Sequence, residues 1–163
     1  EPALGIDRQG RRAEGGAVIF AREGAQRNAK VKMRDQSDLI LKEECYEIIG
    51  SCMRVHSDKG NGFHEPIYQE CLEIDFEIEG TPFEPHAALK MEYRGRELKQ
   101  RFVTDFFVFD QIVLEIKAVN KLTDEHRTQV LNYLAATGYP LGLLVNFGSF
   151  GRLEWERIAN TKQ

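Results

Sequence analysis

Residues 105–117 (DFFVFDQIVLEIK) carry charge at both outer ends of a strongly apolar segment. Two apolar runs, 106–109 and 112–114, flank a short polar break, which is typical of two buried strands joined by a tight turn. Asp105 precedes the first run, and Glu115 and Lys117 close the second. Burying such ionisable groups costs several kcal/mol each unless a partner offsets the loss. Two carboxylates and a lysine at one end of a hairpin offer a hard-cation site beside a proton acceptor, so the segment predicts a metal-dependent phosphodiesterase centre.

The length of the turn decides whether the two carboxylates meet. Glu115 and Lys117 are two residues apart and therefore share one face of a strand. A three-residue loop at 109–111 sets Asp105 directly across from Glu115, with both carboxylates pointing the same way. A two-residue turn at 110–111 shifts the pairing by one residue and sends them to opposite faces. The centre requires the first register, or else strands that splay near Asp105.

Composition limits the class of protein. A chain of 163 residues with 42% hydrophobic content is expected to bury one core. No apolar run approaches the length of a membrane span and no stretch resembles a secretory signal, so we expect a cytoplasmic protein without a membrane partner. Cys45, Cys52 and Cys71 are irregularly spaced, which favours reduced thiols over a disulfide framework or a zinc site. The net charge of −4 does not by itself indicate nucleic acid, although an acidic nuclease can concentrate basic residues where the phosphates lie.

Residues 1–36 differ in composition from the rest. They hold five glycines and eight basic against five acidic residues, a net charge of +3, without sustained periodicity. We expect a flexible or loosely packed extension there and a folded domain over 37–163. Met33 stands just before the first helical pattern, so one hypothesis takes it as a native start.

The remaining pattern predicts two helices, three strands, a helix and two strands, in a mixed α/β sheet flanked by helices. Ser37 or Asp38 is expected to cap the first helix, which breaks at 58–62. The second helix is expected from Pro66 to about Glu79 and the third from Asp124 to about Ala136. Strands are expected at 83–93, 98–109, 112–118, 141–147 and 153–158.

This order of elements, with Asp105 on the second strand and Glu115-Ile116-Lys117 on the third, resembles the PD-(D/E)XK nuclease superfamily. Gly62, Glu65 and Tyr68 match the signature of the small prokaryotic GxxExxY proteins, a branch of that superfamily. The segments 131–138 (LNYLAATG) and 144–148 (LVNFG) also resemble that branch, and the likeness covers about 39–160. It implies a restriction-endonuclease-like core. The proline of the superfamily name is replaced by 103–104 (Val-Thr) before Asp105, which removes no ligand.

The resemblance implies that Asp105, Glu115 and the Ile116 carbonyl bind one or two Mg²⁺ or Mn²⁺ ions. Two acidic side chains plus phosphate oxygens suffice for Mg²⁺, which keeps several waters. Lys117 would orient or deprotonate the attacking water, since a partly desolvated lysine can be driven toward neutrality. The alternative for Lys117 is a salt bridge to Glu115. Glu65 would add a metal ligand or hold a water, or would simply be an acid favoured at a helix start.

Gln129 and Tyr133 are four residues apart and share one face of a helix. In RecB-like members of the superfamily such a pair lies beside the metal and contacts the substrate backbone or orients the lysine. A buried polar pair joining helix to sheet is the alternative. Tyr68 is expected to be a core residue with a tethered hydroxyl.

Residues 90–101 hold five basic side chains against two acidic ones and lead directly to Asp105. One face of this segment could guide phosphates to the metal, although mixed charge on an edge hairpin is also a common solvated surface. The predicted substrate-binding residues here are Lys90, Arg94, Arg96, Lys99 and Arg101.

The sequence thus predicts a Mg²⁺-dependent nuclease that hydrolyses phosphodiester bonds of DNA or RNA. One alternative is a catalytically silent module that binds nucleic acid or a protein partner. Another is a phosphohydrolase acting on other substrates. A domain this small is also expected to need a homodimer or a protein partner for specificity.

Overall fold

The computed structural model describes residues 22–23 and 40–160 of the chain. Its helices are α1 (Lys42–Lys59), α2 (Glu65–Glu79) and α3 (Asp124–Thr137). Its strands are β1 (Arg22–Glu23), β2 (Phe83–Pro85), β3 (Ala88–Leu89), β4 (Glu92–Tyr93), β5 (Arg96–Glu97), β6 (Phe102–Val103), β7 (Phe106–Val108), β8 (Ile112–Lys117), β9 (Leu141–Asn146) and β10 (Glu154–Ala159).

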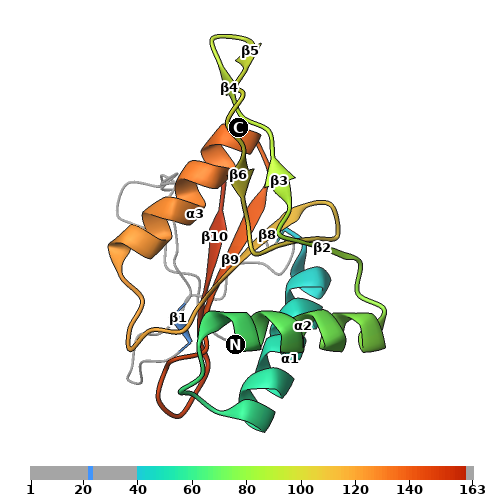
Figure 1. Ribbon diagram of the computed structural model, residues 1–163, viewed down its shortest axis with the longest axis vertical. Helices are drawn as coiled ribbons and strands as arrows, with labels where there is room; N and C mark the ends of the chain where they lie inside the picture. The colour runs from blue at the N-terminus through green and yellow to red at the C-terminus, as the bar shows by residue number, and fades with distance from the viewer. Residues whose placement is uncertain (1–21, 24–39, 161–163) are drawn as a thin grey trace, which may run out of the picture.

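The main sheet has the strand order β1-β10-β9-β8-β7-β2 among the described residues. It is mixed, because β8 and β9 pair in parallel through the crossover helix α3 whereas the other neighbours are antiparallel. Figure 1 shows α1 and α2 crossing below the sheet while α3 lies alongside it. The predicted fold class, a mixed sheet flanked by helices, is confirmed.

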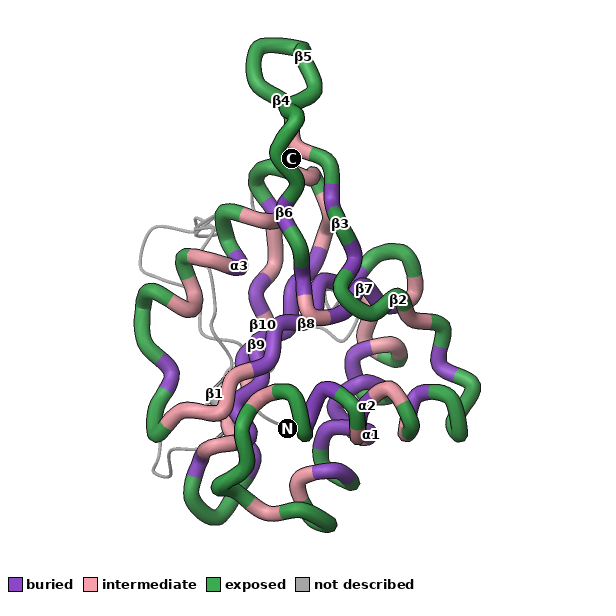
Figure 2. The backbone as a smooth tube through the Cα atoms, viewed as in Figure 1, coloured by how far each residue is buried: buried purple, intermediate pink, exposed green. Residues whose placement is uncertain are grey.

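Alternating residues of the central strands divide the core into two clusters. Leu114 and Ile116 of β8 pack with α1 and α2, whereas Val113 packs with Val130 and Leu134 of α3. Because successive side chains of a strand point to opposite faces, Glu115 and Lys117 share the α3 face with Val113. Figure 2 shows β7 and β9 buried throughout, and β8 is buried up to Lys117, which is half-buried. The fold therefore brings two charged residues against a helix.

The hairpin that turns between β7 and β8 has the register that the site requires. Phe106 pairs with Leu114 and Val108 with Ile112, which leaves a three-residue loop at 109–111. Phe109 and Asp110 in this loop both have a φ of 55°. Continuing the register by one position sets Asp105 opposite Glu115. The three-residue register therefore forms, but pairing with β8 begins only at Phe106, so the strands splay at Asp105 and its carboxylate turns to the Ile116 N–H.

The strands predicted at 83–93 and 98–109 are interrupted, which corrects the prediction of two continuous strands. They form one antiparallel hairpin in three pieces, β2·β7, β3·β6 and β4·β5. The break between the first two lies at 86–87 and 104–105, where His86 takes a φ of 50°. The His86 N–H donates to the Asp105 carbonyl (2.9 Å) and the Thr104 N–H donates to the Ala87 carbonyl (3.1 Å), so the hairpin bends without losing its pairing. This bend carries the chain away from the edge of β8.

Several terminal predictions concern residues that the structure does not describe. Ser37 and Asp38, the expected helix caps, and nearly all of the expected extension at 1–36 lie outside the described residues. Arg22–Glu23 is described and pairs with β10. The first helix begins at Lys42 after Leu41, which has a φ of 57°. No helix in the described ranges combines the length and apolarity that crossing a bilayer requires.

The end of β9 fastens the loop that follows β8. The buried Asn146 amide donates to the Val119 carbonyl (2.8 Å) and accepts from the Val119 N–H (3.0 Å), so it reads both backbone groups of one residue. Gly148 lies so close that a Cβ atom there would meet the Val119 N and O at 2.5 Å. The Asn-Phe-Gly segment therefore holds the exit of β8 in place.

We expect Gly148→Ala to lower the free energy of unfolding by about 2 kcal/mol, because the new methyl group meets backbone atoms that cannot move aside cheaply. Urea denaturation of the two proteins measures the difference. Gly50→Ala is the matched control. Its Cβ would lie 3.6 Å from the flexible end of Arg54, and in a helix alanine is favoured over glycine by up to about 1 kcal/mol. Equal stability of wild type and Gly148→Ala would contradict the close packing.

Candidate active site

The candidate site forms where β7 turns away from β8. At that point side chains replace the hydrogen bonds that a continuing strand would make. The Asp105 Oδ2 accepts from the Ile116 N–H at 2.8 Å, and the buried Thr104 hydroxyl lies 3.2 Å from the Leu114 carbonyl. The backbone groups of β8 thus stay satisfied although the neighbouring strand has left, as buried peptide groups require. These side-chain hydrogen bonds, which take the place of backbone ones, hold Asp105 against the edge of β8.

Glu115 lies on the α3 side of the same edge and is only 4% exposed. Its Oε1 accepts from the Lys117 ammonium at 2.7 Å and from the Gln129 amide at 3.1 Å. Its Oε2 is buried and has no hydrogen-bond partner. Burying a carboxylate oxygen without a partner costs free energy. Both lone pairs of Oε2 therefore remain for another ligand, which would offset that cost.

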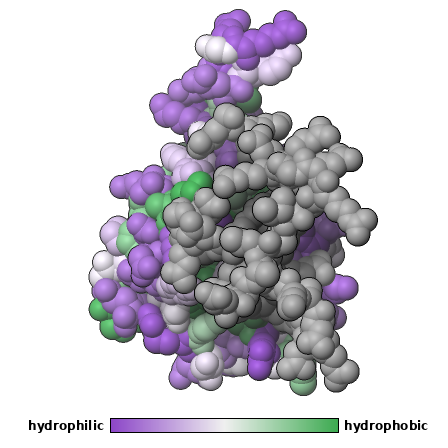
Figure 3. Space-filling view, turned by 180° about the vertical axis from the view of Figure 1, so that it is seen from behind, coloured by the Kyte–Doolittle hydropathy of each residue, from purple (hydrophilic) through white to green (hydrophobic). Residues whose placement is uncertain are grey.

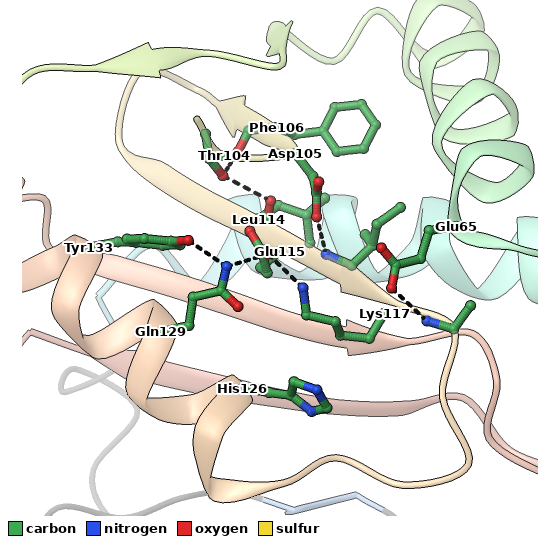
Figure 4. Close-up of polar contacts among 12 residues, drawn as sticks. Glu65, Thr104, Asp105, Phe106, Leu114, Glu115, Lys117, His126, Gln129 and Tyr133 are labelled. Carbon is green, nitrogen blue, oxygen red and sulfur yellow. Dashed lines mark hydrogen bonds and ion pairs between the residues drawn. The ribbon is translucent and has the colours of Figure 1, made fainter. Parts of the chain in front are cut away.

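Glu65 reaches the strand from the opposite side. It is the first residue of α2, and its Oε1 accepts from the Ala118 N–H at 3.3 Å. The N-cap residue His64 makes no side-chain capping bond, and the Glu65 carboxylate contacts the exit of β8. Figure 4 shows Asp105 and Glu65 approaching β8 from the α2 side, whereas Glu115, Lys117 and Gln129 gather on the α3 side.

The Ile116 carbonyl faces the same gap. In a strand, the N–H and C=O of one residue point to the same neighbour, and the Ile116 N–H points to Asp105. Beside this position lies a cleft of about 400 Å³, lined by Asp105, Ile116, Glu65 and Gln69 among others. The site therefore offers oxygen atoms from two strands and a helix around one accessible edge.

The negative groups of the site oppose one another. Burial, and next to it the charge of Asp105, raises the pKa of Glu115 to about 7, against the lowering effect of Lys117. Burial also raises the pKa of Asp105, while the Ile116 N–H bond and Lys117 oppose that rise. Two carboxyl groups that resist ionisation together form a site in which an added cation would relieve the strain of like charges.

Lys117 is an ion-pair partner in this state. Burial by itself would disfavour its charge, but the hydrogen bond and charge of Glu115 outweigh burial, and the pKa of Lys117 is raised. The sequence-based expectation that desolvation drives this lysine toward neutrality is therefore wrong for the protein without a metal. The salt bridge, which was the alternative, is what forms.

Gln129 and Tyr133 do share one face of α3 and lie beside the carboxylates. The Gln129 amide bridges the Glu115 carboxylate and the Tyr133 hydroxyl. Tyr133 stacks on Phe102 of β6. Gln129 thus fixes the orientation of Glu115, and Tyr133 links α3 to the hairpin that carries Asp105.

The predicted basic residues are not gathered around the carboxylates. Lys90 and Arg101 both bind the Glu97 carboxylate, at 3.2 Å and 2.6 Å. Arg94 and Arg96 belong to the β4–β5 end of the hairpin, which Figure 1 shows projecting from the body of the molecule, at the opposite end from α1 and α2. Lys99 is exposed in the same segment.

The oxygen atoms of the site suit a hard cation that needs few protein ligands. Among the described residues, no three His, Cys, Asp or Glu side chains lie close enough together to hold a metal ion, so Glu65, Asp105 and Glu115 are neighbours without forming a finished triad. Mg²⁺ takes only one or two carboxylates and keeps several waters. The unpartnered Glu115 Oε2, the adjacent Asp105 and the Ile116 carbonyl fit such an ion.

Two further residues, which the sequence pattern did not single out, contribute to the site. Thr104 fills the gap in the ladder, and the 8% exposed Gln69 donates to the Asp105 carbonyl at 3.3 Å. Both are polar residues at positions that the pattern assigns to buried faces, and that conflict is the signal that would have pointed to them. Tyr68 behaves as expected, because its buried hydroxyl donates to the Gly60 carbonyl at 2.7 Å and its ring stacks on Phe147.

Comparison with known proteins gives a family match and a similarity to a solved structure. The family model of the PD-(D/E)XK nuclease superfamily matches residues 42–158. Among solved structures, the crystal structure of SSO0001 is similar, with 19% sequence identity and a TM-score of 0.48 over 76% of this chain. The matched part is 61% of that chain, so this protein spans less than two thirds of its length. No curated protein sequence matches.

The raised pKa of Glu115 predicts a pH dependence of stability in the metal-free protein. A carboxyl group whose folded pKa of about 7 exceeds its ordinary value of 4.5 stabilises the fold fully below the lower value, and that contribution is lost as pH rises through the higher one. Between about pH 5 and pH 8 we expect the wild type to lose on the order of 2 kcal/mol more than Glu115→Gln. Urea denaturation at a series of pH values, with a chelator present, measures how the free energy of unfolding of each protein changes with pH. Parallel curves would show that Glu115 ionises normally.

Proposed function

This chain belongs to the PD-(D/E)XK nuclease superfamily, and on that premise we propose that it hydrolyses phosphodiester bonds of nucleic acid with Mg²⁺ or Mn²⁺. The observation that carries the proposal is the meeting of Asp105, Glu115 and Lys117 where the chain bends just before β7, beside the end of β8. Members of the superfamily typically use divalent metals. Here the buried, unpartnered Glu115 Oε2 is the atom with most to gain from a cation.

The cation would be held by Asp105, Glu115 and the Ile116 carbonyl, with Glu65 as a further ligand or a partner of a coordinated water. When bound, a divalent ion supplies charge neutralisation at the phosphate and a lower pKa for the attacking water. These ligands come from the edge of β8 that the bend exposes. The Ile116 N–H bond uses only Oδ2 of Asp105, so Oδ1 could serve as a ligand while that bond is kept.

Lys117 and Gln129 would organise the nucleophile. The Lys117 ammonium lies 2.7 Å from Glu115, so as a cation it can orient the attacking water and the phosphate. It can act as a base only after it gives up its proton, which its ion pair with Glu115 opposes. Gln129 would keep the Glu115 carboxylate in position, and Tyr133 would contact the substrate backbone.

Membership of the GxxExxY branch is part of the proposal. Gly62 takes a φ of 115°, a conformation that suits glycine, and it lies shortly before the start of α2. Glu65 then reaches the exit of β8, and Tyr68 anchors the loop through the Gly60 carbonyl. The three signature residues thus act together to aim one carboxylate at the site.

The distribution of charge favours one route for the substrate. The helix α2 carries six acidic residues and no basic one, and Glu65, Glu70 and Glu73 line the cleft beside Asp105. Phosphates would be repelled from that side. We propose that DNA or RNA lies on the side of α3 and the basic segment 90–101, where a second copy of the chain or a protein partner adds specificity. The cysteines in the described part of the chain are free, which suits the reducing cytoplasm.

One observation favours the alternative of a catalytically silent binding module. Glu115 is already engaged by Lys117 and Gln129, and the described acidic side chains form no ready group of three ligands. A protein of this kind would bind nucleic acid or a protein partner without a divalent ion and would release no products.

We expect Glu115→Ala and Lys117→Ala each to reduce cleavage of nucleic acid by about 10³-fold or more, because each removes a group that acts on the ion or the water. Product release from labelled DNA and RNA with Mg²⁺ or Mn²⁺ measures the loss. Isothermal titration with Mn²⁺ should show binding to the wild type and none to Glu115→Ala.

Glu77→Ala is the matched control, since it removes an exposed carboxylate of α2 away from the bend. It should cleave and bind Mn²⁺ as the wild type does, and circular dichroism should show all four proteins folded. Wild-type cleavage rates in both site variants would refute the proposed centre.

A further inference from the structure

The β4–β5 end of the hairpin, residues 91–99, is here called the tip hairpin. Every residue from 92 to 101 is exposed, and Figures 1 and 2 show the segment extending beyond the body of the molecule. Figure 3, the view from behind, shows that this projecting end is largely hydrophilic. A lone two-stranded hairpin is at best marginally stable in water, so a ribbon of this shape gains order by lying against something else.

The tip hairpin carries unneutralised positive charge. Residues 90–101 contain five basic and two acidic side chains, 5 − 2 = +3, in a chain whose net charge is −4. Glu97 accepts ion pairs from both Lys90 and Arg101, which ties those two cations to the protein. Within the described ranges Arg94, Arg96 and Lys99 have no carboxylate partner. Three cations on an exposed ribbon are therefore available to an outside anion.

The turn at the tip contradicts local preference. Arg94 and Gly95 are its central residues, with φ values of 50° and 73°, as a type I′ turn requires. Asn or Gly is favoured at the first of these positions, because a side chain with a Cβ crowds the backbone there. Arg94 occupies it nonetheless, with its guanidinium 5.5 Å from the ring centre of the 64% exposed Tyr93. Backbone strain of this kind concentrates at functional sites.

Shape narrows the choice of partner. The major groove of B-form DNA is about 12 Å wide and admits a two-stranded β-ribbon, whereas the major groove of A-form RNA is too deep and narrow to be read. Ten residues separate Asp105 from Gly95, and an extended chain rises about 3.3 Å per residue, so the tip lies at most about 33 Å along the chain from the carboxylates. That reach is close to one turn of the double helix, about 34 Å.

We propose that the tip hairpin is a clamp for duplex DNA. Arg94, Arg96 and Lys99 contact backbone phosphates of the major groove within one helical turn of the bond that is cut. This inference rests on the proposed function and narrows its substrate to double-stranded DNA. The acidic α2 leaves the opposite side of the site unsuited to the same duplex.

The test measures the salt dependence of binding, with every protein carrying Glu115→Gln so that the DNA remains intact. Neutralising one phosphate of B-form DNA contributes about 0.9 to the slope of log affinity against log salt. We expect Arg94→Ala/Arg96→Ala to lower the slope by about 1.8 and the affinity for a duplex of roughly 30 base pairs on the order of 10-fold. The affinity of the Glu115→Gln parent should exceed that of the Arg94→Ala/Arg96→Ala variant by less and less as the duplex shortens toward roughly 10 base pairs.

Two variants separate binding from charge and from folding. Lys59→Ala/Arg152→Ala removes the same number of positive charges, two, from outside the hairpin and should leave the slope of log affinity against log salt nearly unchanged. Arg94→Asn installs a residue that favours the turn, so it should preserve or raise the thermal midpoint while it weakens binding. Stability and affinity that rise together would mean that Arg94 has only a structural role and would overturn the clamp.

The remaining outcomes are also decisive. The clamp would be rejected by equal salt slopes for the Glu115→Gln parent and its Arg94→Ala/Arg96→Ala variant, or by equal losses of affinity for single strands and RNA duplexes. In either case, cleavage by the wild-type protein, which keeps Glu115, would still support the proposed function. A loss specific to duplex DNA without any cleavage would support the clamp within the binding-module alternative. A protein that neither binds nor cleaves nucleic acid would reject both.

Discussion

The departure of β7 from the edge of β8 is the constraint on which the candidate site depends. When one strand departs from its neighbour, the neighbour's peptide groups lose their hydrogen-bond partners, and unsatisfied buried peptide groups are costly. The Thr104 hydroxyl donates to the Leu114 carbonyl and the Asp105 carboxylate accepts from the Ile116 N–H, so residues at the bend complete the ladder. A carboxylate is thereby fixed at a strand edge for structural reasons, and that position is also where a cation can reach the Ile116 carbonyl.

The neighbouring elements serve the same edge. Gln69 holds the Asp105 backbone from α2, and Gln129 holds the Glu115 carboxylate from α3. Asn146 fastens the chain immediately after Lys117 through Val119. The exit of β8 is thus supported from both layers and from the adjacent strand. Preorganisation of this kind allows a centre of few ligands to keep its geometry, because the supporting shell limits the freedom of each side chain.

Charge is divided between the two ends of the molecule. The acidic α2 borders the carboxylates, and the basic tip hairpin projects from the far end of the same ribbon that carries Asp105. The raised pKa values of Asp105 and Glu115 belong to the acidic end. Under the proposed function, this charge distribution would attract a polyanion to the tip and repel it near α2, and the bend joins these two regions through one continuous hairpin.

Local patterns along the chain were enough to predict the order of elements, the three-residue turn as one of two possible registers, and the candidate residues from Asp105 to Lys117. They were enough because apolar periodicity and turn residues act over a few positions. The folded chain was needed to find the breaks at 86–87 and 104–105, the roles of Thr104 and Gln69, and the ion pair that keeps Lys117 protonated. They depend on which groups the sheet leaves without a partner and on how deeply neighbouring charges are buried. Such quantities arise from contacts between residues far apart in the chain.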